Sequence, residues 1–287
     1  MREIDLDTKL VFSLGYPLRQ SYAQYIHNYL FEQEQLNYHY IRIEVQPDQL
    51  GQLVNGLRCV NLAGLSVTKP DKIEVVQYLD ERDVSVDVLG SCNTVVCRDG
   101  KLIGYNTDGC GFTQAIREDV PVKDGSFLMF GAGGAGRACS IQLAEEGAGR
   151  IVITDPNVEA AEAVAEQINR RHPGVAQLLD MCNRQQLRQV LKEVDLVANM
   201  SGLGMEKTID CSPLDVQDMD NDAFYFDATY NPAKTKFLKD AESTGHKTMN
   251  GLDMMLCLSV EQFRIWTGRK TTIETIRAFA RKKILGV

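Results

Sequence analysis

The sequence lacks the cysteine and histidine spacings that bind metal ions or build disulfide frameworks. Its eight cysteines are scattered over 287 residues, with no Cys-x-x-Cys pair and no cysteine–histidine cluster. A zinc site is therefore not predicted, and no metal is expected. The cysteines are interpreted as small apolar residues of a protein in a reducing cytoplasm.

Long apolar runs are also lacking. No stretch approaches the roughly 20 residues that a membrane-spanning helix needs. The first residues, MREIDLDTKLVF, carry charges where a secretory signal has an apolar segment. We therefore expect a cytoplasmic protein with no membrane partner.

Positive charge is not in excess. Lys and Arg number 31 against 39 Asp and Glu, a formal net charge of −8. Proteins that bind nucleic acid usually carry a basic surface, so nucleic acid is not expected as a partner. Hydrophobic residues make up 44% of the chain, which is enough for packed cores in one large domain or two ordinary ones. A monomer and a homodimer both remain open.

Strand-like and helix-like segments alternate in the first third, which is typical of an α/β fold. We expect strands at 10–15, 38–45 and 63–68, and helices at 21–33, 47–59 and 72–83. The segments 91–100 and 101–109 follow, and the Asp-Gly step that ends the first of them predicts a hairpin.

A second α/β region begins near residue 126 with SFLMFGAGGAGRACSIQLAEEGAGRIVITD, which has the pattern strand, glycine turn, helix, strand. Further strands are expected at 194–200 and 223–229, with a polar surface loop between them. From Lys234 onward the pattern is mostly helical.

The glycine turn matches the G-x-G-x-x-G pattern of dinucleotide-binding folds through Gly131, Gly133 and Gly136. The first glycine allows a tight turn, the second lets a pyrophosphate approach the backbone, and the third lets helix and strand pack closely. The expected cofactor loop consists of Gly131, Ala132, Gly133, Gly134 and Ala135.

Asp155 ends the next predicted strand, about 20 residues on, where an acid binds the ribose 2′-hydroxyl in this type of site. A carboxylate repels a 2′-phosphate, and residues 156–169 are all neutral or acidic. The sequence therefore favours NAD over NADP. The alternative is a glycine turn that only reverses the chain, with Asp155 as the N-cap of the following helix.

Three polar segments in the first third combine turn residues with chemically active side chains: SVTKPDK at 66–72, SCNT at 91–94 and YNTDG at 105–109. From the residues alone, solvent-facing side chains are the more common outcome for such lysines and aspartates. A lysine and an aspartate at separate strand ends meeting in a cleft is the other possibility.

These segments, in this order and followed by GAGGAG, resemble the shikimate/quinate dehydrogenase family over nearly the whole chain. The family runs N-V-T-x-P-x-K, V-N-T and N-T-D-G are similar to residues 66–72, 92–94 and 106–109. Later family-like runs lie at 199–205, 230–238, 251–255 and 266–268.

The resemblance implies a dehydrogenase that moves a hydride between a nicotinamide and a cyclic secondary alcohol. It implies that Lys72 and Asp108 form the catalytic pair, which handles the proton without a metal. Which of the two takes the proton stays open. The implied substrate-binding residues are Ser21, Ser66, Thr68, Asn93 and Tyr230, and the implied cofactor residues beyond the loop are Asp155, Asn199 and Gly251.

The chain departs from the family pattern at two substrate-binding positions. Ala23 stands where the family has a second carboxylate-binding hydroxyl, and Leu258 stands where it has a glutamine. Losing a hydrogen bond to a charged group costs about 1.5–3 kcal/mol, so shikimate binding is expected to be weaker unless Tyr22 or Lys69 replaces a contact. Quinate, shikimate and related acids remain open as substrates.

The expected architecture is an N-terminal α/β substrate domain at 1–109, a Rossmann-type NAD-binding domain at 110–245, and C-terminal helices at 246–287 that return to the first domain. The active site is expected in the groove between the domains. The alternative hypothesis is that the protein is a dinucleotide-binding regulatory homologue that has lost turnover through its changes at Ala23 and Leu258.

Overall fold

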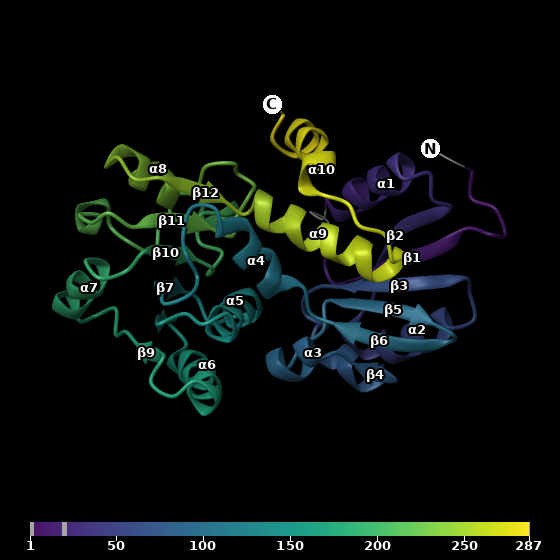
Figure 1. Cartoon of the computed structure of the whole chain (residues 1–287), viewed down its shortest axis with the longest axis horizontal. Coiled ribbons are helices and arrows are strands. Elements are labelled where there is room, and N and C mark those ends of the chain that lie inside the picture. Colours follow the sequence, from purple (N-terminus) through teal and green to yellow (C-terminus); the bar gives the residue numbers. More distant parts are fainter. Residues whose placement is uncertain (1–2, 19–21, 287) are drawn as a thin grey trace. The chain divides into compact units, whose positions relative to one another are not determined.

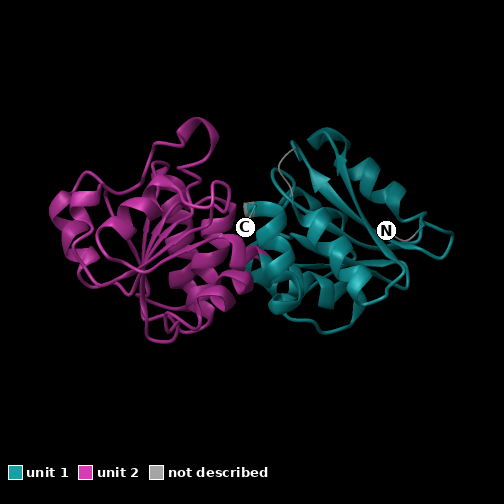
Figure 2. Cartoon of the chain, turned by 90° about the horizontal axis from the view of Figure 1, so that it is seen from above, with its two compact units in different colours: residues 1–107, 256–287 teal, residues 108–255 magenta. Residues whose placement is uncertain are grey.

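The computed structural model describes residues 3–18 and 22–286. The chain divides into two compact units, unit 1 with residues 1–107 and 256–287 and unit 2 with residues 108–255 (Figure 2). Each unit is built around its own sheet, so the predicted α/β class is confirmed. Ser21 lies outside the described residues.

The sheet of unit 1 has the strand order β2-β1-β3-β5-β6-β4 (Figure 1). Its strands are β1 (Lys9–Gly15), β2 (Tyr38–Glu44), β3 (Leu62–Val67), β4 (Glu81–Arg82), β5 (Thr94–Arg98) and β6 (Lys101–Tyr105). Strand β5 runs antiparallel to β3 and β6, and the other pairs are parallel. The β5–β6 hairpin turns at Asp99 and Gly100, whose φ angles of 51° and 78° confirm the expected Asp-Gly turn.

Helices cover both faces of the unit 1 sheet. They are α1 (Ala23–Gln33), α2 (Leu50–Leu57), α3 (Val84–Leu89), α9 (Leu252–Thr267) from Leu256 onward and α10 (Ile273–Ala280), with turns η1 (Pro47–Gln49), η2 (Glu74–Tyr78) and η5 (Arg281–Leu285). Leu50 and Val54 of α2 pack in a buried core with Leu14, Leu65 and Val95. Leu50 and Val54 are four residues apart and therefore lie on the same face of α2, which is the buried face.

A cluster of aromatic rings joins α1 and α9 to the unit 1 sheet. His27 stacks on Tyr40 with ring centroids 4.9 Å apart, and Trp266 meets His27 edge-on at 4.9 Å. The indole N–H of Trp266 donates to the carbonyl of Val95 at 2.9 Å. Helix α1 is therefore fixed against β2, and α9 against β5.

The sheet of unit 2 is wholly parallel, with the order β12-β11-β10-β7-β8-β9 (Figure 1). Its strands are β7 (Ser126–Phe130), β8 (Arg150–Thr154), β9 (Ala176–Leu178), β10 (Leu196–Asn199), β11 (Phe224–Asp227) and β12 (Thr248–Asn250). Counted from β7, this is the 3-2-1-4-5-6 order of the dinucleotide-binding fold. Every residue of β10 and β11 is buried, as expected for central strands with helices on both faces.

Three helices of unit 2 begin at side-chain caps that the sequence supplies. The helices of this unit are α4 (Asp108–Ile116), α5 (Gly134–Glu145), α6 (Val158–Arg171), α7 (Arg184–Leu191), α8 (Lys236–Ser243) and the start of α9, with turns η3 (Glu206–Thr208) and η4 (Val216–Asp218). Asn157, Asn183 and Thr235 accept backbone N–H groups at the starts of α6, α7 and α8.

Two secondary-structure predictions are wrong. Residues 72–83 were expected to form one helix, but they form the turn η2 and the short strand β4, which pairs with β6. Ile73, Val75 and Val76 are β-branched, which disfavours a helix there. Residues 248–250 form β12 in the unit 2 sheet, so the C-terminal helical part begins later than residue 246, and the unit boundary lies at Met255.

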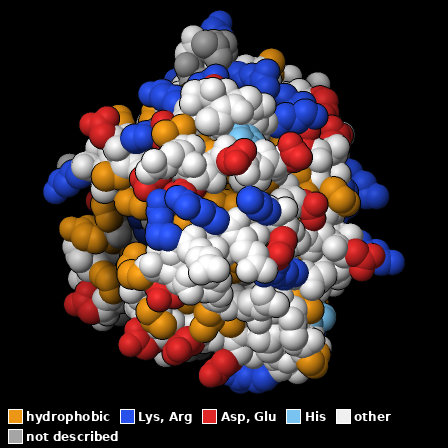
Figure 3. Space-filling view, turned by 90° about the vertical axis from the view of Figure 1, so that its left-hand side faces the viewer, with side chains coloured by type: hydrophobic (Ala, Val, Ile, Leu, Met, Phe, Trp, Pro, Cys, Tyr) orange, Lys and Arg blue, Asp and Glu red, His pale blue; other side chains and the backbone are white. Residues whose placement is uncertain are grey.

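Charged side chains of both signs are interspersed on the side of unit 2 that carries α7 (Figure 3). Arg184 and Arg188 pair there with the buried carboxylate of Asp218. Within the described residues, no helix combines the length and apolarity needed to cross a membrane.

Candidate functional site

The three polar segments of the first third meet at one edge of the unit 1 sheet. The N–H of Cys92 donates to the carbonyl of Lys72 at 2.7 Å, and the N–H of Asn93 donates to that of Tyr105 at 3.1 Å. The Asn93 carbonyl accepts from Val67 at 2.8 Å. Because β3 and β6 end at this edge and the antiparallel β5 begins there, Lys72 and Asn93 are held close together along the backbone.

Asn93 is buried, and its side-chain amide is held by neighbours of unit 1. Its Oδ1 accepts from the Thr107 N–H at 2.9 Å and from the Thr94 hydroxyl at 2.7 Å, and its Nδ2 donates to Thr107 Oγ1 at 3.0 Å. Thr107 directly precedes Asp108, the buried first residue of α4. The bonds to Asn93 therefore fix the chain immediately before the predicted catalytic carboxylate.

The segment with Lys72 also carries an acid that sequence reasoning missed. Asp71 is 1% exposed, and its Oδ2 has no hydrogen-bond partner in the described part of the chain. Burial raises the pKa of Asp71, and the nearby Glu74 adds to the effect. Ser66, Thr68 and Lys72 are half-buried, whereas Lys69 is exposed.

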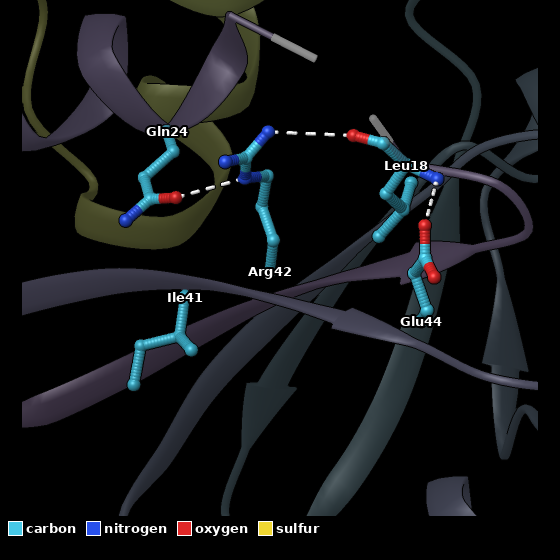
Figure 4. A pocket seen from close by; sticks show the side chains of 5 residues that line it. All are labelled: Leu18, Gln24, Ile41, Arg42 and Glu44. Atoms are coloured by element: carbon cyan, nitrogen blue, oxygen red, sulfur yellow. Dashed lines mark hydrogen bonds between the residues drawn. The ribbon is translucent and has the colours of Figure 1, made fainter. Parts of the chain in front are cut away.

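A pocket of about 340 Å³ lies beside the turn that follows β1 (Figure 4). It is lined by Leu18, Gln24, Ile41, Arg42 and Glu44. Glu44 Oε1 accepts from the Leu18 N–H at 2.8 Å, while Arg42 donates to the Leu18 carbonyl at 3.3 Å and to Gln24 Oε1 at 2.9 Å. Two charged side chains of β2 thus hold the backbone of Leu18, three residues before Ser21.

The glycine loop of unit 2 joins β7 to α5. Gly131 has a φ of 108°, and a Cβ there would lie 2.8 Å from the carbonyl carbon of Met200. A Cβ at Gly136 would lie 1.9 Å from the Gly131 carbonyl oxygen, so the fold itself requires both glycines. Gly133 differs, because its φ is −67° and a Cβ would meet no described atom within 4 Å. This open space at the start of α5 fits a pyrophosphate.

The rest of the loop is arranged around that opening. Gly134 is exposed, and a Cβ there would likewise meet no described atom within 4 Å. Ala135 is half-buried, whereas Ala132 is buried and presents its N–H to a carboxylate at the end of β8.

That carboxylate belongs to Asp155. Its Oδ2 accepts from the Ala132 N–H at 2.7 Å, and its Oδ1 accepts from the Asn157 N–H at 2.8 Å. The N-cap of α6 is Asn157, which accepts from the Ala160 N–H at 3.1 Å, so the alternative of Asp155 as that cap is wrong. Each carboxylate oxygen has two acceptor positions, so each keeps one for a ribose hydroxyl.

The side chain of Asn199 is saturated inside unit 2. Its Nδ2 donates to the Leu203 carbonyl at 3.0 Å and to Asp227 Oδ2 at 2.9 Å, and its Oδ1 accepts from the hydroxyl and N–H of Ser201. An amide has two donors and two acceptor positions, and all four are used. The Asn199 side chain therefore shapes the turn after β10, and a contact of this residue with a cofactor stays a prediction.

Asp227, at the end of β11, was missed by sequence reasoning. It is fully buried and accepts from the Thr235 hydroxyl at 2.7 Å and from the Thr229 N–H at 2.8 Å. Burial raises the pKa of Asp227, and these bonds together with the one from Asn199 partly offset the rise. The carboxyl organises the turn that leads to Tyr230, which is half-buried.

Close backbone packing in unit 2 requires a glycine at position 251. A Cβ there would lie 2.0 Å from the carbonyl oxygen of Ala228, so glycine lets the start of α9 approach the end of β11. Its contact with a cofactor remains a prediction.

Comparisons with known proteins agree with this arrangement. Residues 14–95 match the model of the shikimate dehydrogenase substrate-binding domain, and residues 127–209 match that of the saccharopine dehydrogenase NADP-binding domain. The shikimate dehydrogenase (NADP(+)) of Methanocaldococcus jannaschii is 35% identical over 280 residues, which cover 96% of each chain. The chain belongs to the shikimate dehydrogenase family.

Solved structures of this family are similar over nearly the whole chain. The shikimate 5-dehydrogenase of Listeria monocytogenes, in complex with shikimate and NAD, has a TM-score of 0.92 at 33% identity and covers 97% of this chain and 98% of its own. The quinate dehydrogenase of Corynebacterium glutamicum, in complex with NAD, has a TM-score of 0.86 at 26% identity, with 98% and 99% covered. The resemblance drawn from the motifs is confirmed.

Both positions where this shikimate dehydrogenase family member departs from the pattern lie in unit 1. Ala23 opens α1 and Leu258 lies in α9, and both are half-buried without a polar side-chain group. Neither the family pattern nor the sequence spacing pointed to the charged pair Arg42 and Glu44.

Proposed function

We propose that the protein is a nicotinamide-dependent dehydrogenase that interconverts a secondary alcohol and a ketone on a hydroxylated cyclic carboxylic acid such as shikimate or quinate. Membership of the family together with Lys72, Asp108 and the open Gly133 loop supports this proposal most directly. In it, unit 1 (residues 1–107 and 256–287) supplies most of the substrate contacts, and unit 2 (residues 108–255) holds the dinucleotide.

In the proposed reaction, the hydride and the proton of the alcohol go to different groups. The nicotinamide, when bound, supplies the hydride acceptor or donor. Oxidation of the alcohol also requires that its hydroxyl proton leave, and we assign that proton to Lys72 and Asp108 as a pair. A lysine and a carboxylate can carry out this proton transfer without a metal.

The proposed substrate contacts come from the polar edge of unit 1. Asn93 and Thr68 bind hydroxyl groups of the ring, as does Tyr230 of unit 2, and Ser21 and Ser66 bind the polar substituents. The bonds that hold Asn93 in one orientation support its assignment, because a preorganised amide loses little freedom on binding.

We propose NAD as the cofactor, bound by Asp155 and by the loop Gly131, Ala132, Gly133, Gly134 and Ala135. The carboxylate of Asp155 disfavours a 2′-phosphate, and residues 156–169 offer no cation to balance one. The relative from Methanocaldococcus jannaschii is named for NADP(+), so this preference is a point on which the chain is proposed to differ from it.

The test is the appearance of reduced cofactor when the protein meets NAD or NADP with a panel of cyclic hydroxy acids. Turnover of shikimate or quinate with NAD is expected. Turnover only with NADP would refute the cofactor proposal alone. Binding of the dinucleotide without turnover of any acid would instead favour a regulatory homologue.

A further inference from the structure

A chain of hydrogen bonds runs through unit 1 from α1 to the proposed substrate residue Asn93. His27 Nε2 lies 3.1 Å from Gln262 Oε1, and Gln262 Nε2 donates to Thr94 Oγ1 at 2.9 Å. The Thr94 hydroxyl donates to Asn93 Oδ1 at 2.7 Å. All four side chains are buried, with at most 3% exposed. Solvent therefore does not compete for these bonds.

The donors and acceptors available in these side chains decide which group donates in each hydrogen bond. The Thr107 N–H points at Asn93 Oδ1 from 2.9 Å, so this side of the Asn93 amide is the oxygen. The one hydroxyl hydrogen of Thr94 is donated to that oxygen, so Thr94 Oγ1 accepts from Gln262. The remaining oxygen of Gln262 then accepts, so Nε2 of His27 carries a hydrogen. Every bond donates toward Asn93.

The protonation state of His27 agrees with donation from its Nε2 to Gln262. Burial lowers the pKa of His27 to about 4, against a smaller rise from its bond to Gln262. The ring is therefore neutral at physiological pH and has a single N–H. Nδ1 has no hydrogen-bond partner among the described residues, which leaves Nε2 as the nitrogen that gains from a hydrogen.

We propose that Gln262 is a positioning residue that sets the orientation of the Asn93 amide through Thr94. The inference rests on the proposed function, in which Asn93 binds the substrate. With its oxygen held by Thr94 and Thr107 and its Nδ2 donating to Thr107 Oγ1, the Asn93 amide is kept in one orientation. Without Gln262, the Thr94 hydroxyl hydrogen can turn away, and the Asn93 oxygen loses the donor that lies closest to it.

Three variants test this role. Gln262→Met keeps the length of the side chain but removes its donor, and KM for the accepted acid is expected to rise about three- to tenfold with kcat nearly unchanged. Thr94→Val removes the hydroxyl at constant shape and is expected to have the same effect. Thr94→Ser keeps the hydroxyl and is expected to retain the KM of the native protein.

The double variant separates positioning from general destabilisation. If Gln262 acts through Thr94, adding Gln262→Met to Thr94→Val raises KM no further. Independent, multiplicative effects on KM would overturn the proposal, as would an unchanged KM in folded Gln262→Met. Thermal melting of each variant checks that the folded protein is being compared.

A measurement that needs no turnover checks the direction in which these hydrogen bonds donate. Nitrogen-15 NMR of histidine-labelled protein, with the His27 signals assigned by their loss in His27→Phe, is expected to show Nε2 protonated and Nδ1 unprotonated. A hydrogen on Nδ1 would overturn the inference. If the native protein oxidises no acid, the proposed function fails, and the NMR result still decides the bond direction separately.

Discussion

The carboxylate of Asp155 accepts the backbone N–H of Ala132 at 2.7 Å, across the glycine loop from β7 to α5. This bond holds a negative charge beside the proposed cofactor site. A ribose hydroxyl can donate to such a group, whereas a 2′-phosphate is repelled by it. The proposed preference for NAD should therefore depend on the charge at this one position.

Replacement of Asp155 by asparagine removes that charge and keeps an acceptor for the loop. We expect the ratio of kcat/KM for NAD to that for NADP to fall at least about tenfold, mainly through a lower KM for NADP. Asp195→Asn is the matched control, because Asp195 accepts the Ser126 N–H at the opposite end of the same sheet. Equal shifts in both variants would contradict a local effect of Asp155.

Gly133 and Gly136 should respond in opposite ways to an added methyl group. Gly133→Ala places a Cβ in open space and is expected to weaken NADH binding by about tenfold with little change in melting temperature. Gly136→Ala forces a Cβ against the Gly131 carbonyl and is expected to lower the free energy of unfolding by about 1–3 kcal/mol. Titration of NADH fluorescence and thermal melting measure the two effects. Unchanged NADH affinity in Gly133→Ala would argue against a pyrophosphate there.

Protonation of His27 should destabilise the fold in mild acid. An unfolded histidine takes up a proton near pH 6.5, whereas His27 in the folded protein does so only near pH 4. Between these values the unfolded state binds more protons, so the free energy of unfolding falls as the pH is lowered, by up to about 3 kcal/mol from this residue. Above pH 7 the residue contributes no pH dependence.

Urea unfolding of the native protein and of His27→Gln at several pH values isolates that contribution. The native curve should fall more steeply between pH 6.5 and 4, because glutamine does not titrate. Parallel curves would show that His27 titrates normally.

Glu44 should influence substrate binding through the backbone of Leu18. Glu44→Leu removes the acceptor for the Leu18 N–H and is expected to raise KM for the acid about three- to tenfold, with NADH affinity unchanged. Glu44→Gln keeps an acceptor and should stay close to the native KM. Steady-state kinetics with both variants checks this, and identical KM values for the two would show that the bond has no such role.

Much of unit 2 was predictable because its signals are local. The strand β7, the glycine loop, α5, β8 and Asp155 follow one another within 30 residues, and each has a distinctive composition. The strands β9 and β12, of three residues each, were not predicted, since so short a segment has no periodicity. Helix α7 carried a readable signal in Leu187, Val190 and Leu191, all buried on one face.

The hydrogen bonds that hold the candidate site in place could not be predicted, because they join distant parts of the chain. Gln262 meets Thr94 across 168 positions, and Glu44 meets Leu18 across 26. No spacing rule connects such residues before the fold is known. The motifs therefore predict Asn93 and Lys72 as site residues, whereas the bonds that hold Asn93 became visible only in the structure.

The most direct test of the account is the turnover of Lys72→Met with NAD and the best acid of the panel, measured beside its affinity for NADH. We expect kcat to fall by roughly 10²–10⁴-fold, the usual share of a proton-transferring side chain, with NADH affinity unchanged. Turnover close to that of the native protein would contradict the assignment of Lys72 to the catalytic pair.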